Sequence, residues 1–298
     1  RGRPFHPRLS LPLRRKGRRQ TVADKEMTFL EHLEELRWTL MRSAAVILAA
    51  MLVAFFWKEL VFDTIILAPR DPGFVTYRAL CALSQRLGLG DALCIRDLGF
   101  ELQNISMSGQ FLTHLKVSFV AGLVAASPYV LWELWRFIAP GLNDRERRAA
   151  RSAMVFAGLL FLLGVVFGYF VIAPMSIQFL GSYKVSEAVR NTIALDSFIG
   201  TMTSVPLWTG VMFQLPLAVL VLARLGLMGA AVMRRYRRHA FVGILVVAAV
   251  ITPPDVTSQI LVSLPLLVLY EVSILLAARV ERQALAAEKP RTPIAQAR

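Results

Sequence analysis

Two carboxylates stand within arginine-bearing segments of this chain. Glu35 lies in residues 32–37, which read HLEELR, and Glu146 lies in residues 143–148, which read NDRERR. A carboxylate can meet the planar fork of a guanidinium with two parallel hydrogen bonds, a geometry that the ammonium of lysine does not reproduce. The two residues therefore predict an acceptor for a cationic ligand that carries arginine.

Each carboxylate also has a structural interpretation. Glu146 follows Asn143 by three residues, the spacing of a capping box at the start of a helix. Glu35 could be one polar position on an amphipathic helix at a membrane surface, because Leu33 and Leu36 recur at helical spacing around it. Judged by spacing alone, these structural roles are favoured over a binding role.

The elements that must position these acids are membrane spans. Hydrophobic residues make up 56% of the 298 residues, which is too many for a soluble domain. Six apolar stretches approach the roughly 20 residues that cross a bilayer, although the fifth is short. They are residues 40–57, 111–137, 152–173, 205–223, 240–251 and 260–278. We expect an all-α integral membrane protein with six transmembrane helices.

Lysine and arginine are distributed unevenly about these spans. The segments 1–42, 138–151, 224–239 and 279–298 carry 25 of them, whereas the alternating segments 58–110, 174–204 and 252–259 carry 7. Basic loops stay in the cytoplasm, so both termini are predicted to be cytoplasmic. The protein is expected to cross the cell inner membrane several times. The net charge of +14 comes largely from the tails, which argues against nucleic acid as a partner.

The chain divides into three parts by composition. Residues 1–26 are expected to form a disordered basic arm that contacts anionic membrane lipid, residues 27–280 the membrane domain, and residues 281–298 a polar tail. An amphipathic surface helix is expected to begin at Thr28 and to turn into the first span near Trp38. Prolines at 128, 206, 216 and 265 should bend the spans into a cupped bundle.

Residues 58–110 form the largest segment outside the spans and contain both cysteines, Cys81 and Cys94. An oxidising exterior favours a disulfide between them, and two buried free thiols are the alternative. The chain has no phosphate-binding glycine loop, and its four histidines are scattered singly. We therefore expect no catalytic residues, no metal, no cofactor and no enzymatic activity.

Several segments together resemble one family. These are residues 32–37, the sequence FIAPGL at 137–142 followed by Glu146, Tyr169 with Phe170, and the sequence TPPDV at 252–256 followed by Ser258 and Gln259. Over roughly residues 28 to 280 the chain is similar to the TatC subunit of the twin-arginine protein translocase. The resemblance implies a receptor for twin-arginine signal peptides that exports folded proteins using the proton motive force.

The resemblance also implies roles for individual residues. Glu35 and Glu146 would meet the two guanidinium groups, with Arg37, Phe137 and Leu142 around them. Single-span proteins of the TatA and TatB type would dock near Thr252, Asp255 and Gln259, in a hetero-oligomer of several copies. Members often carry a glutamate in the fourth span where this chain has Gln214, which puts any role for a negative charge there in doubt.

Two other functions compete with this one. A small-molecule or ion secondary transporter would need ionisable residues along a polar path, and Gln214 and Glu271 are too few to build one. A structural anchor that only organises partners would leave Glu35 and Glu146 free to change. The response of signal-peptide crosslinking to substitutions of these acids separates the three.

Overall fold

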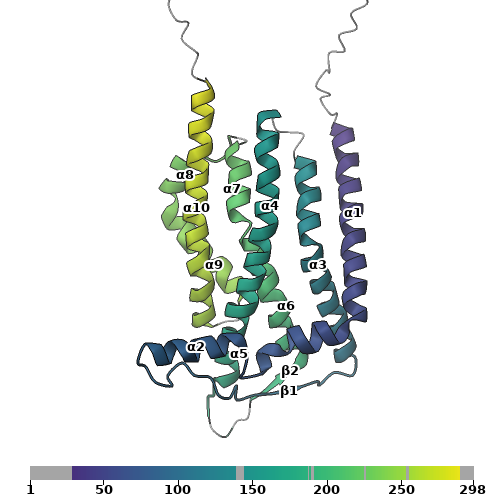
Figure 1. Ribbon diagram of the computed structural model, residues 1–298, viewed down its shortest axis with the longest axis vertical. Coiled ribbons are helices and arrows are strands. Elements are labelled where there is room, and N and C mark those ends of the chain that lie inside the picture. Colours follow the sequence, from purple (N-terminus) through teal and green to yellow (C-terminus); the bar gives the residue numbers. More distant parts are fainter. Residues whose placement is uncertain are drawn as a thin grey trace, which may run out of the picture.

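The computed structural model describes residues 29–138, 144–186, 188, 191–224, 226–252 and 255–288. Long helices stand side by side, and short elements run across one end of the bundle (Figure 1). Five helical stretches in the described residues are long and apolar enough to cross a membrane, in agreement with the predicted all-α membrane class. They are Leu30–Phe56, Gly109–Phe137, Met154–Ser182, Leu195–Arg224 and Ser258–Arg282.

The elements fall into two groups. The bundle consists of α1 (Phe29–Phe56), α3 (Gly109–Ile138), α4 (Asp144–Phe167), η4 (Gly168–Ile172), α5 (Ala173–Ser182), α6 (Leu195–Met212), α7 (Leu215–Arg224), α8 (Ala230–Arg235), α9 (Arg237–Ile251) and α10 (Val256–Glu288). One end is closed by η1 (Glu59–Ile66), η2 (Ala68–Arg70), α2 (Val75–Arg86), β1 (Glu101–Gln103) and β2 (Thr192–Ala194). We call this the cap end, and we call the opposite end, where α1 begins, the basic end.

The fifth expected span is the short one. Helix α9 has 15 residues, which cover about 22 Å at 1.5 Å per residue, less than the roughly 30 Å of a hydrocarbon core. The distance from the cap end to its amino-terminal residue, Arg237, is therefore smaller than the thickness of the hydrocarbon core. The described bundle holds five long stretches and this shorter helix, so the count of six spans stays a prediction.

Close helix crossings hold the bundle together. A Cβ atom added at Gly122 of α3 would lie 2.5 Å from the backbone nitrogen of Met51 in α1. A Cβ atom at Gly168 of η4 would lie 2.6 Å from the Cα atom of Pro206 in α6. Small residues at such crossings let backbones approach within lipid, where apolar burial does not drive association. The main core lies toward the cap end around Ile172, Ile199 and Leu266.

Two local expectations need correction. No separate surface helix precedes the first span in the described residues, because α1 runs unbroken from Phe29 to Phe56 through Trp38. Thr39 and Ser43 are buried, and α1 packs along α3. The second expectation is that Pro206 and Pro216 both bend the fourth span. Pro206 instead lies inside continuous α6, whereas Pro216 stands at the start of α7, after a break in this span. The backbone turn at this break therefore falls beside Gln214.

The cap end is cross-linked in several ways. The sulfur atoms of Cys81 and Cys94 form a disulfide. The hydroxyl of Tyr77 donates to the carbonyl oxygens of Pro69, at 3.1 Å, and Pro174, at 3.3 Å. Burial raises the pKa of this hydroxyl above its ordinary value. Strands β1 and β2 pair in parallel, with Glu101 opposite Thr192, so segments far apart in sequence are tied together.

Candidate functional site at the basic end

The first candidate acid lies where α1 and α3 meet at the basic end. The two helices pack against each other along their length. The rings of His32 in α1 and Phe137 in α3 stack with centroids 4.2 Å apart and planes 19° apart. Glu35 follows His32 by three residues, which places both on one side of the helix. The structure thus places Glu35 one helical turn along α1 from the ring stack that contains Phe137, a second predicted site residue.

Glu35 is half-buried as a residue. Its carboxylate has no hydrogen bond or ion pair to any of the residues that the structure describes. Arg37, the other predicted residue of this helix, is exposed. A carboxylate one helical turn from an aromatic stack can accept a guanidinium through charge-assisted hydrogen bonds, and the alkyl stem of the ligand can pack on the rings.

A second acid at this end was missed in the sequence. The side chain of Glu133 in α3 is only 4% exposed, and its Oε1 lies 3.5 Å from Nη1 of Arg42 and 3.8 Å from Nη1 of Arg136. The hydroxyl of Tyr129 donates to the same oxygen at 3.0 Å. Its Oε2 is buried without a partner in the described part of the chain. The spacing of Tyr129, Glu133 and Arg136 along one helix face was the signal available.

Two other predicted site residues cannot be compared with Glu35 in space. Leu142 lies outside the described residues, and Glu146 belongs to α4 but its side chain also lies outside the described part. The predicted pairing of Glu35 with Glu146 therefore stays a prediction.

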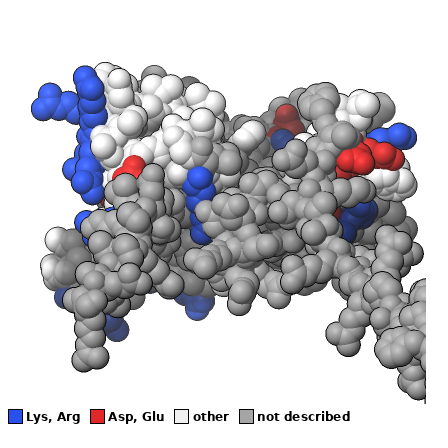
Figure 2. All heavy atoms as spheres, turned by 90° about the horizontal axis from the view of Figure 1, so that it is seen from above, with Lys and Arg blue, Asp and Glu red and all other residues white. Residues whose placement is uncertain are grey.

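The two edges of the basic end differ in charge. Seen from that end, acidic side chains lie together with basic ones at the α1 edge, whereas basic side chains predominate at the opposite edge, on the α8 side (Figure 2). Helix α8 and the start of α9 contribute exposed arginines at positions 234, 235, 237 and 238. Acidic acceptors for a cationic ligand are therefore found at the α1 edge, and the predominantly basic opposite edge is unfavourable for such a ligand.

Gln214 lies in the break between α6 and α7 and bridges to α4. Its Nε2 donates to the carbonyl oxygen of Ala157 at 3.0 Å. Its Oε1 is buried and unbonded within the described ranges. The neutral amide thus supplies interhelical hydrogen bonding at a depth where a carboxylate would be costly.

The predicted docking residues at the α9–α10 hairpin use their polar groups internally. The hydroxyl of Thr252 donates to the carbonyl oxygen of Ala248 at 2.9 Å. Asp255 caps α10, because its Oδ1 accepts the backbone N–H of Ser258 at 2.6 Å. The Nε2 of Gln259 donates to the carbonyl oxygen of Leu245 at 3.2 Å. These side chains shape the hairpin.

Other charged groups have structural explanations. The carboxylate of Glu271, within the sixth span, pairs with Nη2 of Arg237 at 2.6 Å, and Lys116 in α3 is exposed. Potential ligand atoms of Cys81, Asp91 and Cys94 at the cap end lie within 4.8 Å of one another. These residues are not suited to binding a metal ion, because the two sulfur atoms are joined in the disulfide and neither is a thiolate.

Comparison with known proteins gives one consistent result. A sequence profile described as Sec-independent protein translocase protein (TatC) matches residues 31–265. A protein of the same description from Blattabacterium sp. subsp. Periplaneta americana (strain BPLAN) is 34% identical over 250 residues, covering 84% of this chain and 94% of the relative. One from Helicobacter pylori (strain J99 / ATCC 700824) is 36% identical over 249 residues, covering 83% of this chain and 87% of the relative.

Solved structures agree with the sequence relatives. A crystal structure described as Twin Arginine Translocase Receptor TatC in DDM superposes with a TM-score of 0.65 at 29% identity, covering 83% of this chain and 99% of the other. A second crystal structure of the same receptor gives a TM-score of 0.63 at 28% identity, covering 85% of this chain and all of the other.

Proposed function

Because the chain belongs to the TatC family, a component of the twin-arginine protein translocase, we propose that it is the subunit that receives twin-arginine signal peptides. In this role it binds the peptide at the basic end, in the cytoplasm, and exports folded proteins through the inner membrane using the proton motive force. The similar crystal structures are described as a receptor. The high content of lysine and arginine in alternate loops supports the orientation.

The half-buried Glu35 is the observation that carries this proposal. Among the acids that the structure describes at the basic end, Glu35 and Glu133 are the two of the α1–α3 pair that are at least half-buried. Glu133 already interacts with Arg42 and Arg136 of the chain itself. Glu35 has no such partner among the described residues, so its charge is available to a ligand. Phe137, which stacks on His32 one helical turn away, supplies an apolar surface for the ligand's alkyl stem.

We assign the second guanidinium to Glu146, with Arg37 and Leu142 near the peptide. Each charge-assisted hydrogen bond contributes roughly 1.5–3 kcal/mol, so a peptide that loses one pair should bind on the order of tenfold to a hundredfold more weakly. Basic side chains at the opposite edge add selectivity, because they repel cationic peptides that do not reach the acids.

Docking of single-span partners of the TatA and TatB type is proposed at the α9–α10 hairpin. The polar groups of Thr252, Asp255 and Gln259 are engaged within the chain, so they act by fixing the hairpin's shape. The contact surface would come from apolar side chains around them that face outward. These are Val250, Val256, Ile260 and Leu264. A partner helix packed on this face would complete a hetero-oligomer.

Site-specific crosslinking tests the receptor role. A photoreactive twin-arginine peptide is added to membranes containing the wild-type chain, Glu35→Ala, Glu146→Ala or the matched control Glu34→Ala, which removes an exposed acid from the same helix. We expect crosslinking to fall in the first two variants and to persist in the control. Undiminished crosslinking in both Glu35→Ala and Glu146→Ala would reject the receptor assignment, and an equal loss in Glu34→Ala would reduce it to bulk charge attraction.

A further inference from the structure

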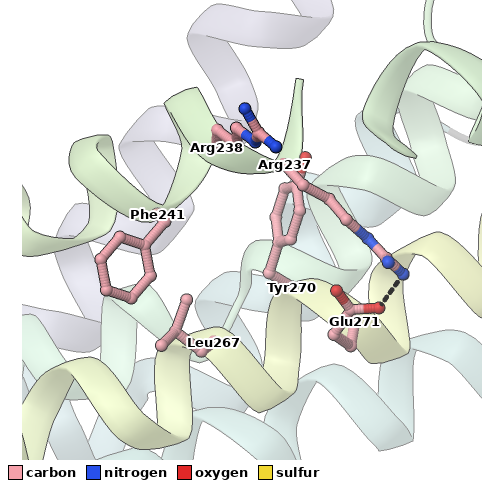
Figure 3. A pocket seen from close by; sticks show the side chains of 6 residues that line it. All are labelled: Arg237, Arg238, Phe241, Leu267, Tyr270 and Glu271. Atoms are coloured by element: carbon pink, nitrogen blue, oxygen red, sulfur yellow. Dashed lines mark hydrogen bonds and ion pairs between the residues drawn. The ribbon is translucent and has the colours of Figure 1, made fainter. Parts of the chain in front are cut away.

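A cleft separates α9 from α10 at the level of the short helix's amino terminus. It has a volume of about 360 Å³ and is lined by Arg237, Arg238, Phe241, Leu267, Tyr270 and Glu271. Figure 3 shows Phe241 of α9 and Leu267 of α10 facing each other across it, with the two arginines on one rim. The cleft thus combines apolar walls with a cationic edge.

The polar groups of the cleft are unequally satisfied. Arg237 reaches Glu271 at 2.6 Å, so these two charges compensate each other (Figure 3). The hydroxyl of Tyr270 donates to the carbonyl oxygen of Met233 at 3.0 Å. Arg238 has neither a hydrogen bond nor an ion pair from its side chain to the described residues. It is therefore the cation of the cleft that lacks a counter-charge within the described chain.

The neighbouring sequence increases this positive charge. Arg234 and Arg235 at the end of α8 are exposed and directly precede Tyr236 and α9. Among the described residues that line the cleft, Glu271 is the one acid. The described lining with these neighbours therefore has an excess of positive charge, which favours an anionic ligand.

The depth of the cleft makes an unpaired guanidinium unfavourable. Arg237 and Arg238 begin a helix whose 15 residues cover about 22 Å from the hairpin, so these side chains lie nearer the hydrocarbon than the ends of the longer helices. Charged groups at such a depth require a partner or a path to the interface. The anions available at this level are the phosphate groups of membrane lipids.

We propose that the cleft between α9 and α10 binds an anionic phospholipid from the leaflet at the basic end. The lipid phosphate accepts hydrogen bonds from Arg238, with Arg234 and Arg235 adding attraction. An acyl chain lies between Phe241 and Leu267. Basic pockets between transmembrane helices recognise lipid head groups in this way, and a planar guanidinium suits a phosphate through paired hydrogen bonds.

The apolar walls are the reason to prefer a lipid over free phosphate. A free inorganic phosphate would leave the facing surfaces of Phe241 and Leu267 without a ligand contact, whereas an acyl chain covers both. Because Arg238 and the walls are separate features, each can be altered while the other is retained.

The test measures lipid binding by native mass spectrometry. The full-length protein in dodecyl maltoside is mixed with dioleoyl phosphatidylglycerol or with dioleoyl phosphatidylcholine, and the ratio of the two affinities is recorded. The variants are Arg238→Gln, Leu267→Trp, which fills the cleft and retains its charges, and the matched control Arg282→Gln, an exposed arginine of α10 that does not line the cleft. Thermal unfolding of each variant verifies folding.

We expect the preference for phosphatidylglycerol to fall about fivefold in Arg238→Gln, the effect of removing one basic residue near an anionic head group. Leu267→Trp should weaken binding of both lipids, and Arg282→Gln should leave the ratio unchanged. An unchanged ratio in Arg238→Gln, or an equal fall in Arg282→Gln, would overturn the proposal. Displacement of the lipid by millimolar inorganic phosphate would show a free-anion site and would also overturn it. These outcomes are independent of signal-peptide binding.

Discussion

Polar side chains are bonded differently at the two ends of the bundle. At the cap end, Tyr77 makes two hydrogen bonds to carbonyl oxygens, Asp255 caps α10, and a disulfide joins Cys81 to Cys94. At the basic end, Glu35 has no partner among the described residues and Glu133 has a buried oxygen with none there. The bonds that join distant segments are therefore concentrated at the cap end, and an acid without a partner among the described residues lies at the basic end.

This difference teaches how a membrane protein can present a receptor surface on a stable frame. Unpaired polar groups are costly when buried, and they are tolerated where the rest of the fold restrains the helices that carry them. Gly122 fixes the approach of α1 to α3, and the cap fixes the far ends of the spans. Substitutions at the cap end should therefore change stability, whereas substitutions at the basic end should change binding.

The largest expected effect is that of opening the disulfide. The double substitution Cys81→Ser with Cys94→Ser should lower the free energy of unfolding by roughly 3 kcal/mol, because the bond closes a loop with a sequence separation of 13. Chemical unfolding in detergent measures it. Reducing agent should shift the wild type by a similar amount and leave the variant unchanged. A variant as stable as the wild type would show that the disulfide does not stabilise the cap end.

A smaller effect is expected for the cap of α10. Asp255→Ala removes the oxygen that accepts the N–H of Ser258 and should cost about 1 kcal/mol of unfolding free energy, the usual value of a helix cap. Asp255→Asn retains an acceptor oxygen and serves as the matched control, and its loss of unfolding free energy should be only a few tenths of the loss in Asp255→Ala. Equal losses in the two variants would mean that the carboxylate's charge, and not its capping bond, stabilises the hairpin.

The smallest effect is expected for Glu133→Gln at the basic end. Its contacts to Arg42 and Arg136 are long, at 3.5 Å and 3.8 Å, and the two arginine side chains are 40% and 59% exposed. The amide retains an acceptor for Tyr129, so the loss of stability should stay below about 1 kcal/mol. The same unfolding assay gives the value. A loss larger than that of Asp255→Ala would mean that the basic end is as tightly bonded as the cap end.

Much of this architecture could be predicted from composition. Apolar runs and base distribution predicted the membrane class, and the short fifth stretch corresponds to α9. The role of Glu133 could not be predicted in the same way, because its burial depends on how α1 and α3 face each other. The approach of Gly122 to Met51 depends on the register of two helices, which apolar periodicity does not determine. The continuity of α1 through Trp38 depends on the same packing.

The parallel pairing of β1 with β2 has a consequence for the order in which the protein assembles. Glu101 lies before α3 and its partner Thr192 lies after α5, so the pair can form only when the intervening spans have crossed the membrane. Contacts between such distant segments close late, because the chain entropy of a long loop must be overcome first. A chain halted before residue 192 during synthesis would therefore have its first spans inserted and this junction still unmade.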